Sequence, residues 1–251
     1  LGAVEAVVTT SGTATTLGGA VPRRPSRRPV LADRPLRAMG EAMLVDSPRP
    51  CDGSLDGFDG STPLLMADEA HYYRSEEPYQ GEDSLNATGY LNWSPGGLHL
   101  GVVVTKQDVV LGPAVPPLLG RDNEADDIHF DGIQVYYRAP GAPPRAFLIR
   151  PNEAGGIFAR PIPGSPASPV DLPGGSAVSD DGYQISVTLP CPELATLRVG
   201  AQIEFDLVVN EMRPDRVSRA GQLAWGGGSG WVYLRGDRRA EDQWGMIELV
   251  A

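Results

Sequence analysis

The densest group of side chains that could hold a metal ion lies in the acidic segment 122–132, DNEADDIHFDG. Clustered carboxylates suit Ca²⁺, a hard cation that binds oxygen ligands. The spacing fits no EF-hand loop, so a solvated acidic loop is the competing interpretation. We predict no other cofactor. The candidate ligands for a structural calcium ion are Asp122, Asp126, Asp127 and Asp131.

The other residue types that commonly do chemistry form no recognisable motif. His71, His99 and His129 stand in no His/Cys spacing that zinc uses. His99 falls within an expected strand, and we predict that its side chain points outward. The sequence also lacks nucleophile-elbow, phosphate-loop, dinucleotide-binding and H-E-x-x-H motifs. We therefore predict that the protein is not an enzyme.

Cys51 and Cys191 are the two cysteines, and their wide separation matches no metal motif. They could form one disulfide if the chain is exported to an oxidising compartment. The alternative is that both are small buried hydrophobic residues. No apolar run is long enough to cross a membrane as a helix, and no signal-peptide pattern opens the chain. We expect an extracytoplasmic, peripheral protein, either periplasmic or secreted.

Residues 21–40, VPRRPSRRPVLADRPLRAMG, form a basic arm with a net charge of about +5 in a chain of net charge -11. Its prolines favour an extended backbone. We interpret it as a docking arm for an acidic protein subunit or an anionic membrane surface. The alternative is that it folds back on its own acidic domain. Nucleic acid is not an expected partner, because the rest of the chain would repel phosphate. The arginines assigned to partner binding are Arg23, Arg24, Arg27, Arg28, Arg34 and Arg37.

The elements that must position these residues are short strands. Alternating or β-branched runs recur along the chain, Gly and Pro together number 55, and helical periodicity is almost absent. We predict an all-β fold, a two-sheet antiparallel β-sandwich of jelly-roll type over residues 42–251. An N-terminal β-hairpin and the Arg/Pro-rich arm would occupy residues 1–41. The clearest strand candidates are 84–93 with 98–105 as a hairpin, 130–138, 145–150 with 155–160, 183–190 and 201–210.

The order of these pieces resembles the family 9 carbohydrate-binding module over about residues 45–250. The matching segments read DGSLDGF, WSPGGLHLGVVVT, DGIQVYY, DDGYQISVTLPCPEL, GAQIEFDLVVNEM and WGMIEL. The sequence departs from the family pattern at four positions. Phe58 and Cys191 stand where the family has Trp, and Gln134 and Ser186 stand where it has Glu.

The resemblance implies the sandwich fold and a sugar held against aromatic faces. Trp225 and Trp231 flank a glycine run, with Tyr233 and Asn210 nearby in sequence, and these four are the candidate sugar-binding residues. The alternative is that both tryptophans lie in the core.

Some sandwiches of the wider superfamily bind haem through axial side chains. Here Lys106 with Met66 or Met212 could be imagined in that role, although a surface lysine is the simpler interpretation.

Two functions remain open from the sequence. In the first, the protein is a non-catalytic accessory or scaffold subunit, which its basic arm docks onto a larger, membrane-associated complex. In the second, it is the carbohydrate-binding module of a secreted polysaccharide-active enzyme. The charged arm favours the first slightly, because linkers in secreted enzymes are usually neutral. The family resemblance favours the second.

Overall fold

The computed structural model describes residues 37–58, 60–73, 78–113, 126–162, 165, 171–215, 219–226 and 244–251, without the side chains of Tyr73 and Asp126. The N-terminal hairpin and the basic arm up to residue 36 therefore lie outside the described residues. Within the described part, strands dominate and the helical pieces are three short 3-10 turns. They are η2 (Glu69–His71), η3 (Asp126–Ile128) and η4 (Pro192–Ala195).

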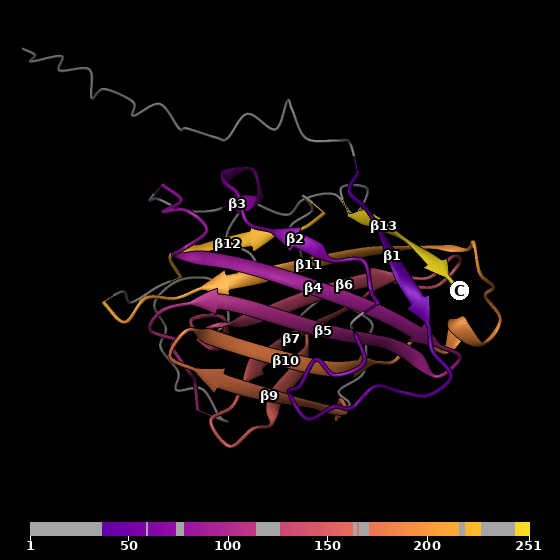
Figure 1. Ribbon diagram of the computed structural model, residues 1–251, viewed down its shortest axis with the longest axis horizontal. Coiled ribbons are helices and arrows are strands. Elements are labelled where there is room, and N and C mark those ends of the chain that lie inside the picture. Colours follow the sequence, from indigo (N-terminus) through magenta and orange to yellow (C-terminus); the bar gives the residue numbers. More distant parts are fainter. Residues whose placement is uncertain are drawn as a thin grey trace, which may run out of the picture.

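The strands of the described residues form one hydrogen-bonded sheet that folds over into two packed layers, confirming the predicted sandwich (Figure 1). The front layer contains β4, β5 and β10, and the back layer contains β6, β7 and β11. The order across the sheet is β8-β7-β6-β11-β13-β1-β4-β5-β10-β9, with β12 beside β11, β2 beside β4 and β3 beside β12. The first half of the strands is β1 (Met39–Leu44), β2 (Leu64–Met66), β3 (Tyr72–Tyr73), β4 (Leu85–Ser94), β5 (Gly97–Lys106) and β6 (Gly132–Arg138). The remainder is β7 (Arg145–Pro151), β8 (Ile157–Pro161), β9 (Gly174–Ser179), β10 (Gly182–Leu189), β11 (Gln202–Glu211), β12 (Gly221–Ala224) and β13 (Gly245–Val250).

The two hairpins predicted within the described residues are present. β4 and β5 pair along their whole length from Leu85 opposite Lys106 to Ser94 opposite Gly97. β7 pairs with β8, as the sequence indicated. The segment that begins with Asp52 packs on the front layer, where the Gly53 N–H donates to Ser186 Oγ at 2.9 Å. Ser186, which replaces the Glu of the family pattern, therefore anchors this segment.

One seam of the sandwich is parallel, which differs from the antiparallel prediction. β1 runs parallel to β13 from Met39 to Met43 and then parallel to β4 at Met43 and Leu44. A parallel pair needs a long connection, and here the connection between β1 and β13 is the rest of the domain. β1 also begins at Met39, slightly before the expected boundary at residue 42.

Both faces of the back layer are buried. Alternate residues such as Val135, Phe205 and Leu207 enter the main core between the layers. The opposite, outer face carries a second apolar cluster, in which the rings of Tyr136 and Trp244 lie 5.7 Å apart. We call this surface the outer face of the back layer.

His99 lies on the outer side of the front layer, as its place in the strand predicted, but it is buried rather than solvent-exposed. Its Nε2 contacts Ser94 Oγ at 2.9 Å and its Nδ1 contacts Thr188 Oγ1 at 3.0 Å. Burial, and the nearby charge of Arg49, lower the pKa of the imidazole to about 4. The outward-pointing ring is buried because the segment containing Arg49 and Cys51 covers this part of the sheet.

Cys51 and Cys191 are free thiols in this structure, so the suggested disulfide is absent. Cys51 Sγ lies 3.4 Å from Thr188 Oγ1, and Cys191 Sγ lies 3.6 Å from Glu193 Oε2. Burial raises the pKa of the Cys191 thiol to about 12, so this cysteine stays protonated and unreactive at neutral pH. Among the described residues, no helix combines the length and hydropathy needed to cross a membrane.

The burial of the His99 imidazole predicts that the folded protein loses stability in acid. The folded-state pKa of His99 lies below its usual value near 6.5, so the folded protein resists protonation and the unfolded chain does not. The stabilisation is complete above about pH 6.5 and is lost as the pH falls through 4, by up to about 3 kcal/mol. Urea unfolding followed by tryptophan fluorescence at pH 7, 5.5 and 4 should show this loss. His99→Gln should lose distinctly less stability over that range, and an unchanged pH dependence in the variant would contradict the assignment.

Candidate functional site

One open pocket of about 430 Å³ lies where β4 begins and where β5 and β11 end. Its lining is strongly polar and charged, which raises the question of which of its groups are available to a ligand. The lining residues are Gln80, Asp83, Ser84, Lys106, Gln107, Asp108, Glu211, Arg213, Pro214 and Asp215.

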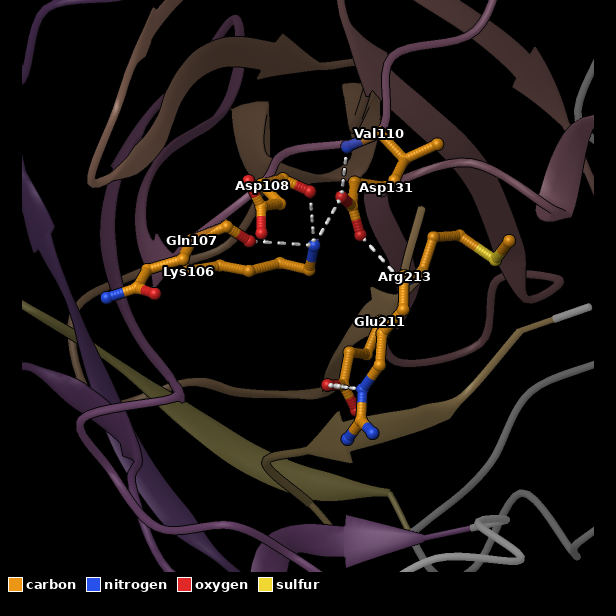
Figure 2. Close-up of polar contacts among 8 residues, drawn as sticks. Lys106, Gln107, Asp108, Val110, Asp131, Glu211 and Arg213 are labelled. Atoms are coloured by element: carbon orange, nitrogen blue, oxygen red, sulfur yellow. Dashed lines mark hydrogen bonds and ion pairs between the residues drawn. The ribbon is translucent and has the colours of Figure 1, made fainter. Parts of the chain in front are cut away.

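A buried ion pair between Lys106 and Asp131 lies at the base of this pocket (Figure 2). Lys106 Nζ is 2.9 Å from Asp131 Oδ2 and also donates to the carbonyl oxygens of Gln107 and Asp108. Asp131 accepts further hydrogen bonds from the backbone N–H groups of Val110 and Met212. Burial raises the pKa of the Asp131 carboxyl to about 6, against the opposing effect of Lys106 and these N–H donors.

The interpretation of Lys106 as a surface lysine is therefore wrong, because only 3% of the residue is exposed. Its ammonium group is already saturated with oxygen acceptors, so it is not free to act as an axial ligand. Met66 and Met212, the residues considered beside it, are both buried.

The second buried charge of the pocket is also satisfied. Glu211 accepts a hydrogen bond from the Tyr72 hydroxyl on one carboxylate oxygen and from Arg213 Nε, at 3.1 Å, on the other. Figure 2 shows Glu211 and Arg213 side by side below the Lys106–Asp131 pair. The deep part of the pocket is thus a set of internally paired charges, which is typical of a structural network.

Removing one partner of the Lys106–Asp131 pair should lower the free energy of unfolding. Lys106→Met leaves the Asp131 carboxylate buried without its cation, and we expect a loss of roughly 3–5 kcal/mol in unfolding free energy at pH 7. The double variant Lys106→Met/Asp131→Asn should recover a measurable part of that loss. Arg145→Met, which opens the more exposed Arg145–Glu193 pair, is the control and should cost about 1 kcal/mol or less. Urea unfolding measures all three, and a loss below about 1 kcal/mol for Lys106→Met would contradict the assignment.

A second polar feature crosses the outer face of the back layer. Asn210 on β11 pairs with Gly132 on β6 and with Gln222 on β12. Arg150 on β7 lies on the other side of Gly132, since a Cβ on this glycine would meet Arg150 Cγ at 3.0 Å. We call Arg150, Gln134, Asn210 and Gln222 the outer-face row.

The amides of the row form a connected group with two open atoms. Gln134 Nε2 and Gln222 Nε2 both donate to Asn210 Oδ1 at 2.8 Å, and Tyr136 donates to Gln134 Oε1. Asn210 Nδ2, a donor, and Gln222 Oε1, an acceptor, have no hydrogen-bond partner although both side chains are fully buried. Buried polar atoms are normally paired, so open ones in a fixed arrangement indicate a place for a ligand or water.

Arg150 is the charged member of the row. Its guanidinium lies between the rings of Phe130 and Phe158, at 5.2 and 5.3 Å from their centroids. Nη2 donates to the Pro113 carbonyl oxygen at 3.1 Å, while Nη1 has no partner. Burial lowers the pKa of this guanidinium, and Asp127 opposes the shift from a distance.

The four sugar-binding residues suggested by the sequence do not lie together in one described site. Asn210 is at the centre of the row. Trp225 is only 6% exposed and packs edge-on against Phe205 in the main core, so it is not an exposed stacking surface. Trp231 and Tyr233 lie outside the described residues.

The suggested calcium ligands do not share one centre among the described residues. Asp127 is bound through both carboxylate oxygens by Arg160, and Asp131 belongs to the Lys106 pair. Each carboxylate therefore already has its own cation. Asp122 and the side chain of Asp126 lie outside the described part, within which no group of three or more metal-binding side chains occurs.

Of the arginines assigned to partner binding, Arg23, Arg24, Arg27, Arg28 and Arg34 lie outside the described residues. Arg37 has partners within its own chain. Its Nη1 lies 3.5 Å from Glu204 Oε1 and 3.0 Å from Met246 Sδ. Arg37 thus contacts the sandwich itself, and its role in partner binding stays a prediction.

Sequence reasoning missed Gln134, Gln222 and Arg150 as site residues. Gln134 was noted only as a neutral replacement for an acid of the family pattern. The available signal was that polar planar side chains occupy outward positions of strands whose alternate residues are apolar, as in IQV and LIR. Which of these positions lie next to one another is set by pairing between distant strands, which the sequence does not display.

Comparisons with known proteins agree with this geometry at the level of the fold. By sequence, no protein-family model and no curated protein matches the chain. Among solved structures, a family 9 carbohydrate-binding module from Caldicellulosiruptor kristjanssonii in complex with cellotriose is similar, with a TM-score of 0.58, 13% identity and coverage of 85% of this chain and 94% of that one. The chain has the fold of a family 9 carbohydrate-binding module.

Two further structures show the same likeness. A family 9 module from the same organism in complex with glucose has a TM-score of 0.56 and 14% identity. The alignment covers 84% of this chain and 94% of that module. A candidate carbohydrate-binding protein from Bacteroides uniformis has a TM-score of 0.53 and 10% identity, and covers 85% of this chain and 99% of its own.

Proposed function

We propose that the protein is a non-catalytic carbohydrate-binding module and that a sugar unit binds at the outer-face row. The observation that carries the proposal is the pair of open atoms in this row, Asn210 Nδ2 and Gln222 Oε1. A sugar hydroxyl is both a donor and an acceptor, so one hydroxyl or two neighbouring ones would satisfy both atoms. The similarity of the fold to modules solved with glucose and cellotriose supports this choice of ligand.

The row fits a sugar better than the open pocket does. The buried charges of the pocket, Lys106, Asp131 and Glu211, are satisfied by one another or by neighbouring groups. In the row, unpaired buried amides cost free energy, and a ligand that pairs with them recovers it. A ligand lacking the matching hydroxyls would leave them unpaired, which gives the row selectivity for hydroxyl-rich molecules.

The burial of the row has a kinetic consequence. Asn210, Gln134 and Gln222 are at most 1% exposed in the ligand-free protein. A sugar reaches them only after the groups above them shift, so association should be slower than the roughly 10⁵–10⁷ M⁻¹s⁻¹ of preformed sites.

The alternative function, an accessory subunit docked through the basic arm, has no observation in its favour among the described residues. Arg37 is engaged with Glu204, and the other arginines of the arm lie outside the described part. We therefore place carbohydrate binding, with a secreted or periplasmic location, ahead of docking on a membrane complex.

The substitution Asn210→Asp tests sugar binding at the outer-face row, because it changes the size and shape of the side chain very little. The new carboxylate oxygen can still accept from Gln134 and Gln222, but the open Nδ2 donor is replaced by an oxygen. Isothermal titration calorimetry against a panel of mono- and oligosaccharides should show binding to the unaltered protein and a loss of roughly tenfold or more in the variant.

Asn86→Asp is the matched control, because it makes the same substitution on β4, at a part-exposed position in the other layer. It should bind sugar as the unaltered protein does, and thermal unfolding should show that all three proteins are folded. Equal binding by Asn210→Asp, or no binding of any sugar by the unaltered protein, would overturn the proposal.

A further inference from the structure

We propose that the sugar recognised at the outer-face row is an acidic one, a uronic acid unit whose carboxylate pairs with Arg150. This inference rests on the carbohydrate-binding function proposed above and narrows it to a class of ligand. Its starting observation is the buried guanidinium of Arg150, which forms no ion pair with a carboxylate of the described residues.

The charge on Arg150 is unusual for its surroundings. The residue is 4% exposed, and its one hydrogen bond goes to the neutral Pro113 carbonyl. Charged groups buried this deeply are almost always paired, because removal from water is otherwise expensive. Arg145 and Arg160, which are more exposed than Arg150, each have a carboxylate partner. Arg150 Nη1 is therefore a buried, charged donor that could bind an anion.

The guanidinium is also held in a fixed orientation. Phe130 and Phe158 contact it from two sides, and Nη2 is tied to the backbone at Pro113. The open nitrogen, Nη1, is therefore presented without the loss of side-chain freedom that an exposed arginine would suffer on binding. A rigid, poorly hydrated guanidinium is well suited to a planar carboxylate.

The rest of the row does not repel a negative ligand. Gln134, Asn210 and Gln222 are neutral, and Gln134 stands where an acidic residue would put a negative charge beside the ligand. The nearby carboxylate of Asp127 is neutralised by Arg160. Asp206, whose Oδ1 accepts the N–H groups of Leu207 and Gly226, lies four residues before Asn210 on β11, about 13 Å away along the strand.

The open atoms of the row match the parts of a uronic acid. The carboxylate would accept from Arg150 Nη1, and the ring hydroxyls would accept from Asn210 Nδ2 and donate to Gln222 Oε1. Gly132 lies between Arg150 and Asn210 in the sheet and has no side chain to separate the two ends. A bound acidic sugar chain could thus offer a group to each of these three atoms.

The test compares ligands that differ only in charge. Tetramers of galacturonate and of glucuronate, each beside its fully methyl-esterified form, are titrated into the intact protein by calorimetry at low and at high salt. The unaltered protein should bind at least one acidic tetramer roughly tenfold or more tightly than its neutral ester, because hydrogen bonds to charged groups are the stronger ones. Arg150→Met should abolish this difference and bind acid and ester alike.

Arg145→Met is the matched control, since it removes an arginine from the same strand that already has a carboxylate partner. It should keep the preference for the acidic tetramer. Thermal unfolding should show that Arg150→Met and Arg145→Met are both folded at the temperature of the titrations.

Equal affinity of the unaltered protein for acids and esters, or a preference that survives Arg150→Met, would overturn this inference while leaving carbohydrate binding intact. Failure to bind any of the four tetramers, together with binding of a neutral sugar from the wider panel, would also overturn the inference alone. Failure to bind every sugar would remove the proposed function and this inference with it.

Discussion

The burial of both faces of β6 and β11 is the constraint on which the rest of the structure depends. These two strands pair from Glu204–Arg138 to Asn210–Gly132 and form the middle of the back layer. Their inward residues must be apolar to fill the core, whereas their outward residues are also removed from water. Polar side chains on that second face are consequently forced to pair with one another or to await a ligand, which is why the amides of Gln134 and Asn210 are so closely coupled.

The Lys106–Asp131 pair and the outer-face row differ in whether all of their buried polar atoms have partners. At the end of the sandwich, Lys106 and Asp131 complete each other and are supplied with backbone donors and acceptors. Such a pair fixes the positions of the strand ends but contributes little net stability compared with an apolar replacement. On the outer face, Arg150 and two amide atoms are left open. The first arrangement pairs its buried charges, and the second leaves these three polar atoms unpaired.

The fold could be predicted from the sequence because alternation in runs such as YQISVTLP and the turn at Ser94–Gly97 are local signals. The candidate site could be predicted only in part. Asn210 was identified, yet its neighbours Gln222 and Gln134 come from strands paired by long-range contacts. Lys106 was expected at the surface, and the outward direction of His99 was predicted but its burial was not, since the sequence does not show which loops cover a strand end or an outward face. The parallel seam was missed for the same reason, because it joins segments at opposite ends of the domain.

That seam also constrains how the domain is made. β1 pairs with β13 through five residue positions, although nearly all of the described chain is synthesised between them. Closing so long a loop is slow, and the contact cannot exist until the last strand has left the ribosome. Until then β1 can pair only with β4, through two residue positions, and the facing edge of β11 remains uncovered. The nascent protein therefore carries unpaired strand edges for most of its synthesis, a state in which sheets are prone to associate with other chains.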